Sequence, residues 1–317
     1  MRITNNMLVS NMTYNLNGTL QRLEKLQFES SKGKKFRVPS DDPIAASKSL
    51  KFNTDISKVS QYLRNTKDAK AWMKESESAF KEINEVLKRT YELTNQAANG
   101  TNAPDDLKKI EAEITELKGH LIQIGNTTYA GRSIFTGYKT DKELLDENGN
   151  YKVNIGLDDG GVPIDEVFVY NVGVAERVSV NTLGNKIFGS GTKDYETEVT
   201  AGSKAYLIQM FDDLEAALAG TSANPADDLQ TALGNIKDAS NQILSVTAEI
   251  GAKTNRIQLT ESKLEDQLIN LKELLSFNED VSLPEAMMKL AIEENVYNAS
   301  LAVGARIIQP SLMDFLR

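Results

Sequence analysis

Apolar residues at both ends of the chain recur with alternating steps of three and four, which is the spacing of a narrow helical stripe. Near the N-terminus the stripe consists of Val9, Met12, Leu16, Leu23 and Leu26, with the polar Thr19 at the position between. Near the C-terminus it consists of Leu283, Met287, Leu290, Tyr297, Leu301, Ile308, Leu312 and Phe315, interrupted by Glu294 and Gly304. Neither helix can bury its stripe alone. We therefore expect the terminal helices to pair with each other, with copies of themselves, or both.

Signals for helix ends divide the N-terminal half of the chain. Gly33 suits a helix C-terminus and Pro39 cannot continue a helix, so residues 30–40 are predicted to break the first helix. Asp42 is a good N-cap residue and Pro43 fits the first turn of a new helix. The apolar spacing predicts that this helix continues to about Asn99. A helix of that length is more typical of a rod than of a compact globule.

Two further heptad patterns lie on either side of the middle of the chain. The first consists of Leu107, Ile110, Ile114, Leu117, Leu121 and Ile124. The second consists of Leu229, Leu233, Ile236, Ala239, Ile243, Val246 and Ile250, and it continues to Leu275 as a second very long helix. The predicted fold class is therefore mainly α, with a long antiparallel helical rod or bundle formed by the N- and C-terminal halves.

The central segment 139–200 has a different pattern. Tyr151, Val153 and Ile155 alternate with polar residues or glycine, and further valines up to Val180 indicate more strands. The segment is predicted to be a small β-rich domain inserted at the tip of the helical rod.

Three parts follow from these patterns. Residues 1–40 with 278–317 are expected to form terminal coiled-coil helices that stay disordered until assembly. Residues 41–138 with 201–277 are expected to form the helical rod, which carries the insert 139–200.

Composition excludes several classes of site. The chain contains no cysteine, so disulfides, thiolate catalysis and cysteine-based metal sites are impossible. His120 is the one histidine, which excludes a metal site built on a histidine pair. Lys and Arg number 36 against 45 Asp and Glu, a net charge of −9 that argues against nucleic acid as a partner. No run of apolar residues exceeds four, so no segment is expected to span a membrane, and residues 1–6 lack the apolar stretch of a signal peptide. The C-terminal 39 residues carry three basic residues against six acids, the wrong sign for anionic lipid, so no membrane partner is expected.

The remaining candidates for chemistry have plain structural interpretations. A calcium loop starting at Asp146 fails, because Tyr151 stands at the sixth position and Leu157 at the twelfth. His120 lies beside an apolar stripe, where a polar helix residue needs no further role. A carboxylate-based hydrolase site would need two acidic residues at a suitable spacing, and no pair in the insert has such a spacing. We therefore predict no catalytic residue, no metal and no cofactor, and a protein that is not an enzyme.

Residues 32–37 contain four basic residues, Lys32, Lys34, Lys35 and Arg37, without an acid among them. Nucleic acid and anionic lipid are weak explanations, because the chain as a whole is acidic and the segment has no aromatic interleaving. We expect these side chains to face acidic patches on neighbouring copies, or water.

Several stretches resemble the bacterial flagellins and their relatives. Residues 31–43 read SKGKKFRVPSDDP, and the residues of this motif that resemble the family most are Pro39, Ser40, Asp41, Asp42 and Pro43. Residues 126–137 resemble the end of the family's first helical half. Residues 294–316 are similar to its C-terminal helix and include Gly304, Ala305 and Arg306. The resemblance covers the two helical halves, whereas the insert 139–200 resembles no family that we can name.

The resemblance implies a structural role in the bacterial flagellum. Residues 1–7 and 309–316 are more similar to the subunit of the hook–filament junction than to flagellin. The implied partners are the first hook-associated protein, flagellin, copies of the chain in a ring, and an export chaperone at the C-terminal helix. The implied location is extracellular, after type III export without a cleaved signal peptide. Flagellin itself is the first alternative, and a cytoplasmic coiled-coil scaffold is the second.

Overall fold

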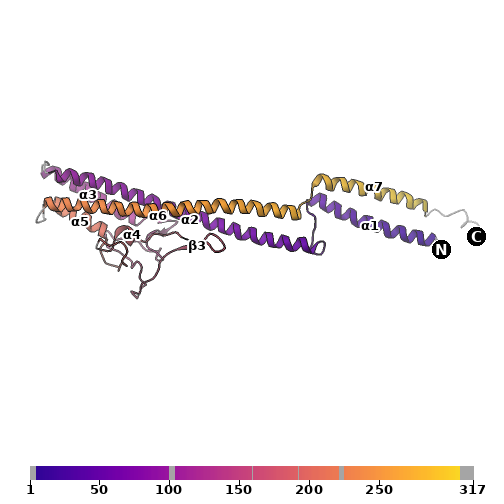
Figure 1. Cartoon of the computed structure of the whole chain (residues 1–317), viewed down its shortest axis with the longest axis horizontal. Helices are drawn as coiled ribbons and strands as arrows, with labels where there is room; N and C mark the ends of the chain where they lie inside the picture. The colour runs from indigo at the N-terminus through magenta and orange to yellow at the C-terminus, as the bar shows by residue number, and fades with distance from the viewer. Residues whose placement is uncertain (1–4, 100–103, 159, 192, 221–224, 308–317) are drawn as a thin grey trace, which may run out of the picture. The chain divides into compact units, whose positions relative to one another are not determined.

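The computed structural model describes residues 5–99, 104–158, 160–191, 193–220 and 225–307. Within these ranges the chain is mainly α, as predicted (Figure 1). The helices are α1 (Asn5–Lys32), α2 (Pro43–Ala98), α3 (Pro104–Gly125), α4 (Asn185–Phe188), α5 (Tyr206–Leu218), α6 (Pro225–Glu279) and α7 (Leu283–Ile307). The strands are β1 (Thr128–Tyr129), β2 (Arg132–Ser133), β3 (Val169–Asn171) and β4 (Arg177–Ser179).

The chain divides into two compact units, and neither follows the boundaries expected from sequence. The first unit comprises Met1–Val59 with Asp266–Arg317, and the second comprises Ser60–Glu265. Because α2 and α6 are unbroken, each of them contributes to both units. The segment 139–200 belongs to the second unit rather than forming a third.

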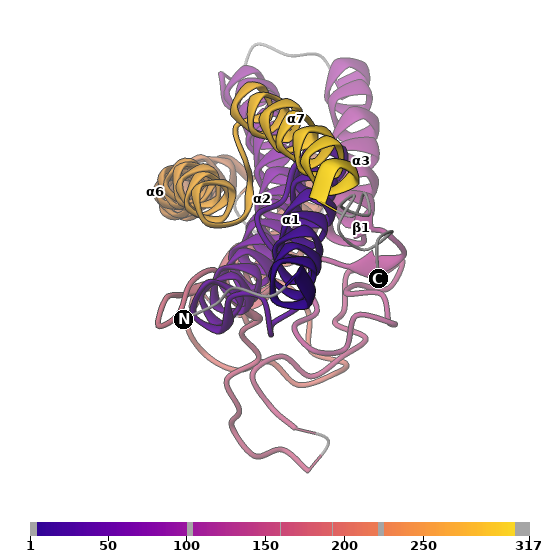
Figure 2. The same cartoon turned by 90° about the vertical axis from the view of Figure 1, so that its right-hand side faces the viewer.

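In the first unit α1 and α7 lie side by side and antiparallel (Figures 1 and 2). The predicted helix ends are confirmed at both ends of the linker that follows α1. Gly33 adopts a φ of +69° and donates its N–H to the carbonyl of Glu29, which ends α1. One carboxylate oxygen of Asp42 accepts the N–H groups of Ile44 and Ala45, which is an N-cap of α2.

In the second unit a single core joins the helices to the segment between them. Phe80 of α2 stacks on Phe135, which lies after β2, with ring centroids 5.8 Å apart. Helix α5 packs against α3 and buries the face that carries Leu207, Phe211 and Leu214. The sequence interpretation did not single out α5, although its apolar residues recur at helical spacing.

The β content of segment 139–200 is smaller than predicted. The hairpin of β3 and β4 is its regular sheet within the described residues, with Tyr170 opposite Val178. Tyr151, Val153 and Ile155 are buried as their alternation predicts, but this run forms only isolated bridges. Val174, expected in a strand, is 92% exposed in the connection between β3 and β4.

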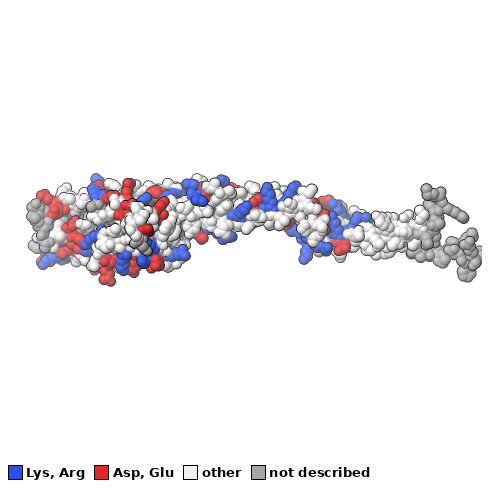
Figure 3. Space-filling view, turned by 90° about the horizontal axis from the view of Figure 1, so that it is seen from below, with Lys and Arg blue, Asp and Glu red and all other residues white. Residues whose placement is uncertain are grey.

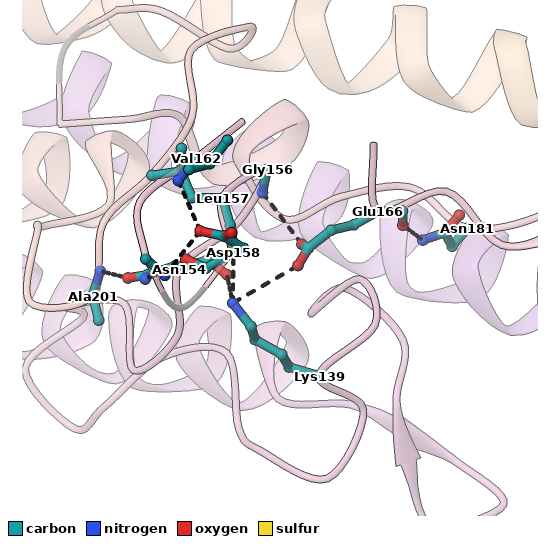
Figure 4. A network of polar contacts seen from close by, with 10 residues as sticks. Lys139, Asn154, Gly156, Leu157, Asp158, Val162, Glu166, Asn181 and Ala201 are labelled. Carbon is teal, nitrogen blue, oxygen red and sulfur yellow. Dashed lines mark hydrogen bonds and ion pairs between the residues drawn. The ribbon is translucent and has the colours of Figure 1, made fainter. Parts of the chain in front are cut away.

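A buried polar network holds this segment together (Figure 4). The ammonium group of Lys139 donates to the backbone carbonyls of Asn154 and Leu157, at 3.2 and 3.0 Å. It also lies 3.8 Å from a carboxylate oxygen of Glu166, whose side chain is fully buried. The other oxygen of Glu166 accepts the N–H of Gly156. One lysine thus joins three stretches of chain that have little regular secondary structure.

Candidate assembly surface

The stripe predicted on α1 faces α7. Val9, Met12, Leu16, Leu23 and Leu26 are each partly buried, and Thr19 is 4% exposed. The hydroxyl of Thr19 donates to the carbonyl of Asn15, so the one polar residue of the stripe is satisfied within its own helix.

The stripe predicted on α7 is only partly correct. Leu290 and Tyr297 are partly buried and Gly304 is buried, but Leu301 is 41% exposed. Ile308, Leu312 and Phe315 lie outside the described residues. The protected positions of α7 are Ala286, Leu290, Glu293, Tyr297, Ser300 and Gly304.

Small residues and one ion pair explain the difference. The side chain of Met12 lies against Gly304, and Ala286 and Gly304 are the buried positions of α7. Between them, Arg22 donates to the carboxylate of Glu293 at 2.5 Å. Glu293 is therefore held on the α1 side of α7, and Leu301 points outward.

The outer faces of the pair carry exposed apolar side chains, and part of each helix contains no charged residue. Residues 5–21 and 295–305 contain no charged residue, and Figure 3 shows this end of the unit almost free of charged side chains. The exposed apolar side chains of both helices are Met7, Leu8, Tyr14, Leu20, Leu283, Met287, Met288, Ile292, Val296, Leu301 and Val303. We call these eleven residues the outer apolar face. Exposed apolar groups of this extent are typical of interaction surfaces.

The residues of the family motif shape the linker between α1 and α2. One carboxylate oxygen of Asp41 accepts the N–H groups of Arg37 and Val38, at 3.0 and 3.2 Å. These two hydrogen bonds hold the pKa of Asp41 below its usual value. Pro39, Ser40 and Pro43 are exposed beside it, as are Ala305 and Arg306 at the other end of the motif set.

Two of the four basic residues of segment 32–37 bind partners within the chain. The expectation that the segment faces neighbouring copies therefore applies only to the other two. The ammonium group of Lys34 lies 2.7 Å from Asp280 and 2.9 Å from Glu279, and the hydrogen bond to Asp280 raises its pKa most. Lys35 donates to the carbonyl of Phe277 at 2.5 Å. Among the described residues, Lys32 and Arg37 form no ion pair, so these two cations remain available.

Asp146 and His120, the other candidates for chemistry, have plain structural surroundings. Asp146 accepts the N–H groups of Asn148 and Asn150 through one carboxylate oxygen, which is turn chemistry. His120 is exposed on α3. The described residues contain no group of three or more metal-ligating side chains. No described helix combines the length and the apolar character needed to cross a membrane.

Known proteins of similar sequence and fold are flagellar. Flagellar hook-associated protein 3 of Escherichia coli K12 is 28% identical over 282 residues, covering 86% of each chain. Flagellin of Bacillus subtilis 168 is 27% identical over 316 residues, covering 98% of this chain and 97% of that protein. The crystal structure of a flagellar junction protein from Legionella pneumophila has the same fold, with a TM-score of 0.55 and 16% identity over 73% of this chain and 99% of that one.

The two ends of the chain match the two helical regions that define one family. The profile of the bacterial flagellin N-terminal helical region matches residues 3–140. The profile of the bacterial flagellin C-terminal helical region matches residues 233–316. Together the matches cover more than two thirds of the chain, and residues 141–232 lie between them. The protein is therefore a member of the bacterial flagellin family, a structural component of the flagellum.

Proposed function

We propose that this chain forms the junction layer between the hook, with its first hook-associated protein, and the flagellin filament. The observation that carries the proposal is the outer apolar face on a helix pair whose residues 5–21 and 295–305 carry no charge, in a chain whose two ends match the flagellin helical regions. A subunit with different neighbours above and below makes heterologous contacts, which build rings and tubes rather than closed dimers. The role is structural rather than enzymatic.

In the assembled layer, the predicted stripe residues near both ends of the chain contribute to helix contacts. Leu301, Ile308, Leu312 and Phe315 contact helices of neighbouring copies or of the same chain. The outer apolar face is covered by copies of this chain in a ring, by flagellin and by the first hook-associated protein. Such a face supports order that is gained on assembly, because a lone helix pair buries little apolar area.

Before assembly, the same chemistry supports a second partner. A cytoplasmic export chaperone covers α7, where Met288, Ile292 and Val296 are each at least 42% exposed. The subunit then leaves the cell through the flagellar export route without a cleaved signal peptide and takes its place in the extracellular flagellum.

The first test is immunogold labelling of intact flagella with an antibody against residues 139–200. Label at one point, where hook meets filament, supports the junction role. Label along the whole filament overturns it in favour of flagellin, the alternative that the similarity to the Bacillus subtilis protein favours. Label only inside cells overturns both the junction role and the flagellin role and favours a cytoplasmic scaffold.

A truncation tests the part assigned to the terminal helices. Removal of residues 300–317 is expected to abolish incorporation into the hook tip, because it deletes Gly304, which packs against Met12 of α1, together with the predicted stripe residues beyond it. Unchanged incorporation would show that these residues are not needed for assembly.

A further inference from the structure

A surface pocket of about 300 Å³ lies beside α1 in the first unit. Gln21, Glu24, Lys25 and Phe28 of α1 line one wall, and Lys35, Phe36, Arg37 and Asp41 of the following linker line the other. None of these residues belongs to the predicted stripe or to the outer apolar face.

The pocket lies on the side of α1 that points away from α7. Successive helix residues are rotated by about 100°, so residues two apart point in nearly opposite directions. Lys25 and Phe28 are each two positions after a stripe residue, Leu23 and Leu26. Because the stripe faces α7, the pocket stays open when α1 and α7 pair.

The linker wall is held in place by hydrogen bonds and ion pairs. Asp41 accepts two backbone N–H groups of the linker, as described above. Lys35 donates its backbone N–H to the carbonyl of Glu279 at 2.7 Å, and Val281 donates to the carbonyl of Gly33 at 2.9 Å. A wall tied to the chain before α7 is preorganised, which lowers the entropy cost of binding.

Arg37 is the cation of this pocket whose side chain forms no hydrogen bond or ion pair within the described residues. Its guanidinium carbon lies 5.9 Å from the ring centroid of Phe28. Lys35 is occupied by a carbonyl, Lys25 lies 4.0 Å from Glu29, and Asp41 is occupied by backbone N–H groups. A guanidinium beside an aromatic ring keeps donors free along its edge, and those donors match a carboxylate in a bidentate arrangement.

We propose that this pocket receives an Asp or Glu side chain of a second copy of the chain, bound by Arg37. The carboxylate accepts two hydrogen bonds from the guanidinium, and its methylene stem contacts Phe28 and Phe36. Charge complementarity favours this occupant, because the lining carries the cations Lys25, Lys35 and Arg37 against the acids Glu24 and Asp41, while each copy carries a net charge of −9. The inference rests on the proposed function only in requiring that copies of the chain lie side by side.

The absence of cysteine allows a direct test. Gln21→Cys supplies the single thiol of the chain, at the pocket rim, for a benzophenone label on subunits assembled into flagella. Irradiation is expected to yield a cross-linked dimer of this chain, and mass spectrometry is expected to find an acidic residue within the attached peptide. A cross-link to flagellin or to the first hook-associated protein, or no dimer, overturns the proposal.

Charge variants in the labelled background assign the role of Arg37. Arg37→Glu is expected to lower the dimer yield by at least about tenfold, whereas Arg37→Lys retains part of it, because a bidentate charge-assisted contact is lost or weakened. Lys32→Glu is the matched control, an exposed and unpaired cation of the same basic segment, and it leaves the yield unchanged. Equal yields for Arg37→Glu and Lys32→Glu overturn the proposal. Equal thermal unfolding of these two variants excludes misfolding as the cause.

The same flagella separate this proposal from the function above. Antibody label at the hook–filament boundary without the dimer leaves the junction role standing and removes the pocket contact. Label along the filament together with an Arg37-dependent dimer overturns the junction role and leaves the pocket contact standing.

Discussion

The side chain of Met12 lies against the backbone of Gly304, where α1 packs on α7. A Cβ atom built at Gly304 would lie 1.7 Å from Cε and 2.6 Å from Sδ of Met12. A glycine is needed at this level of the pair because the methionine occupies the space of any larger side chain. The position interrupts the apolar heptad of α7 in sequence, yet it is one of the most protected positions of that helix.

Substitution of Gly304 tests this contact. Gly304→Leu is expected to weaken the helix pair by about 1–3 kcal/mol, because Met12 and the helix backbones must move. Hydrogen exchange of α1 and α7 amides measures the loss, and Met12→Ala in the same chain is expected to recover part of it. Gly18→Ala is a control, since its Cβ meets only Arg22 at 3.7 Å, and its higher helix propensity stabilises by up to about 1 kcal/mol. Faster exchange confined to α7 would contradict a shared contact.

The ion pairs of Lys34 predict a pH-dependent linker. The hydrogen bond from Lys34 lowers the pKa of Asp280 most, and Ser276 adds a second hydrogen bond. A carboxyl whose pKa is lower in the folded state stabilises it above the unfolded pKa, and the contribution is lost as pH falls through the folded pKa. Lys34→Met is therefore expected to raise the pKa of Asp280 toward its usual value, though not fully, because Ser276 remains.

Carboxyl NMR titration of the full chain measures that pKa. Lys32→Met removes a nearby cation that has no ion pair within the described residues, so it controls for a general change in charge. A pKa of Asp280 that is the same in both variants would show that the contact with Lys34 does not form in solution.

The network around Lys139 predicts a large effect from a neutral substitution. Lys139→Met leaves the fully buried carboxylate of Glu166 without its ion pair and is expected to destabilise the second unit by about 3–5 kcal/mol. Lys142→Met, at an exposed lysine of the same segment, is expected to change stability by less than about 0.5 kcal/mol. Urea unfolding followed by circular dichroism measures both. Adding Glu166→Gln to Lys139→Met should recover stability, and a further loss would argue against the ion pair as the cause.

Two glycines with the same backbone geometry separate strain from crowding. Gly149 and Gly202 have φ values of +79° and +89°, so alanine is strained at either position. A Cβ at Gly149 would lie 2.3 Å from Cγ2 of Ile208, whereas a Cβ at Gly202 meets nothing within 4 Å. Gly202→Ala is expected to cost about 1–2 kcal/mol, and Gly149→Ala a further 1–3 kcal/mol, about the cost of overpacking a core. Equal unfolding free energies for the two variants would show that Ile208 moves aside freely.

The pocket at Arg37 was not predictable from the sequence. The four basic residues of segment 32–37 stand close together in sequence, but the fold gives them different partners. Lys34 and Lys35 reach residues 277–280, which are more than 240 positions away along the chain. Only the folded arrangement separates the cations that are used within the chain from Arg37, which is not.

Local sequence determined the helices of this protein and the family to which it belongs. Gly33 and Asp42 set the ends of α1 and the start of α2, because capping depends on residues within one turn. The tertiary structure decided which face of α7 meets α1. A heptad of large apolar residues favours Met287 and Leu301, but the face turned inward carries the small buried residues Ala286 and Gly304, and Glu293 bound to Arg22. That choice depends on the side chains of the partner helix, which the periodicity of one helix does not contain.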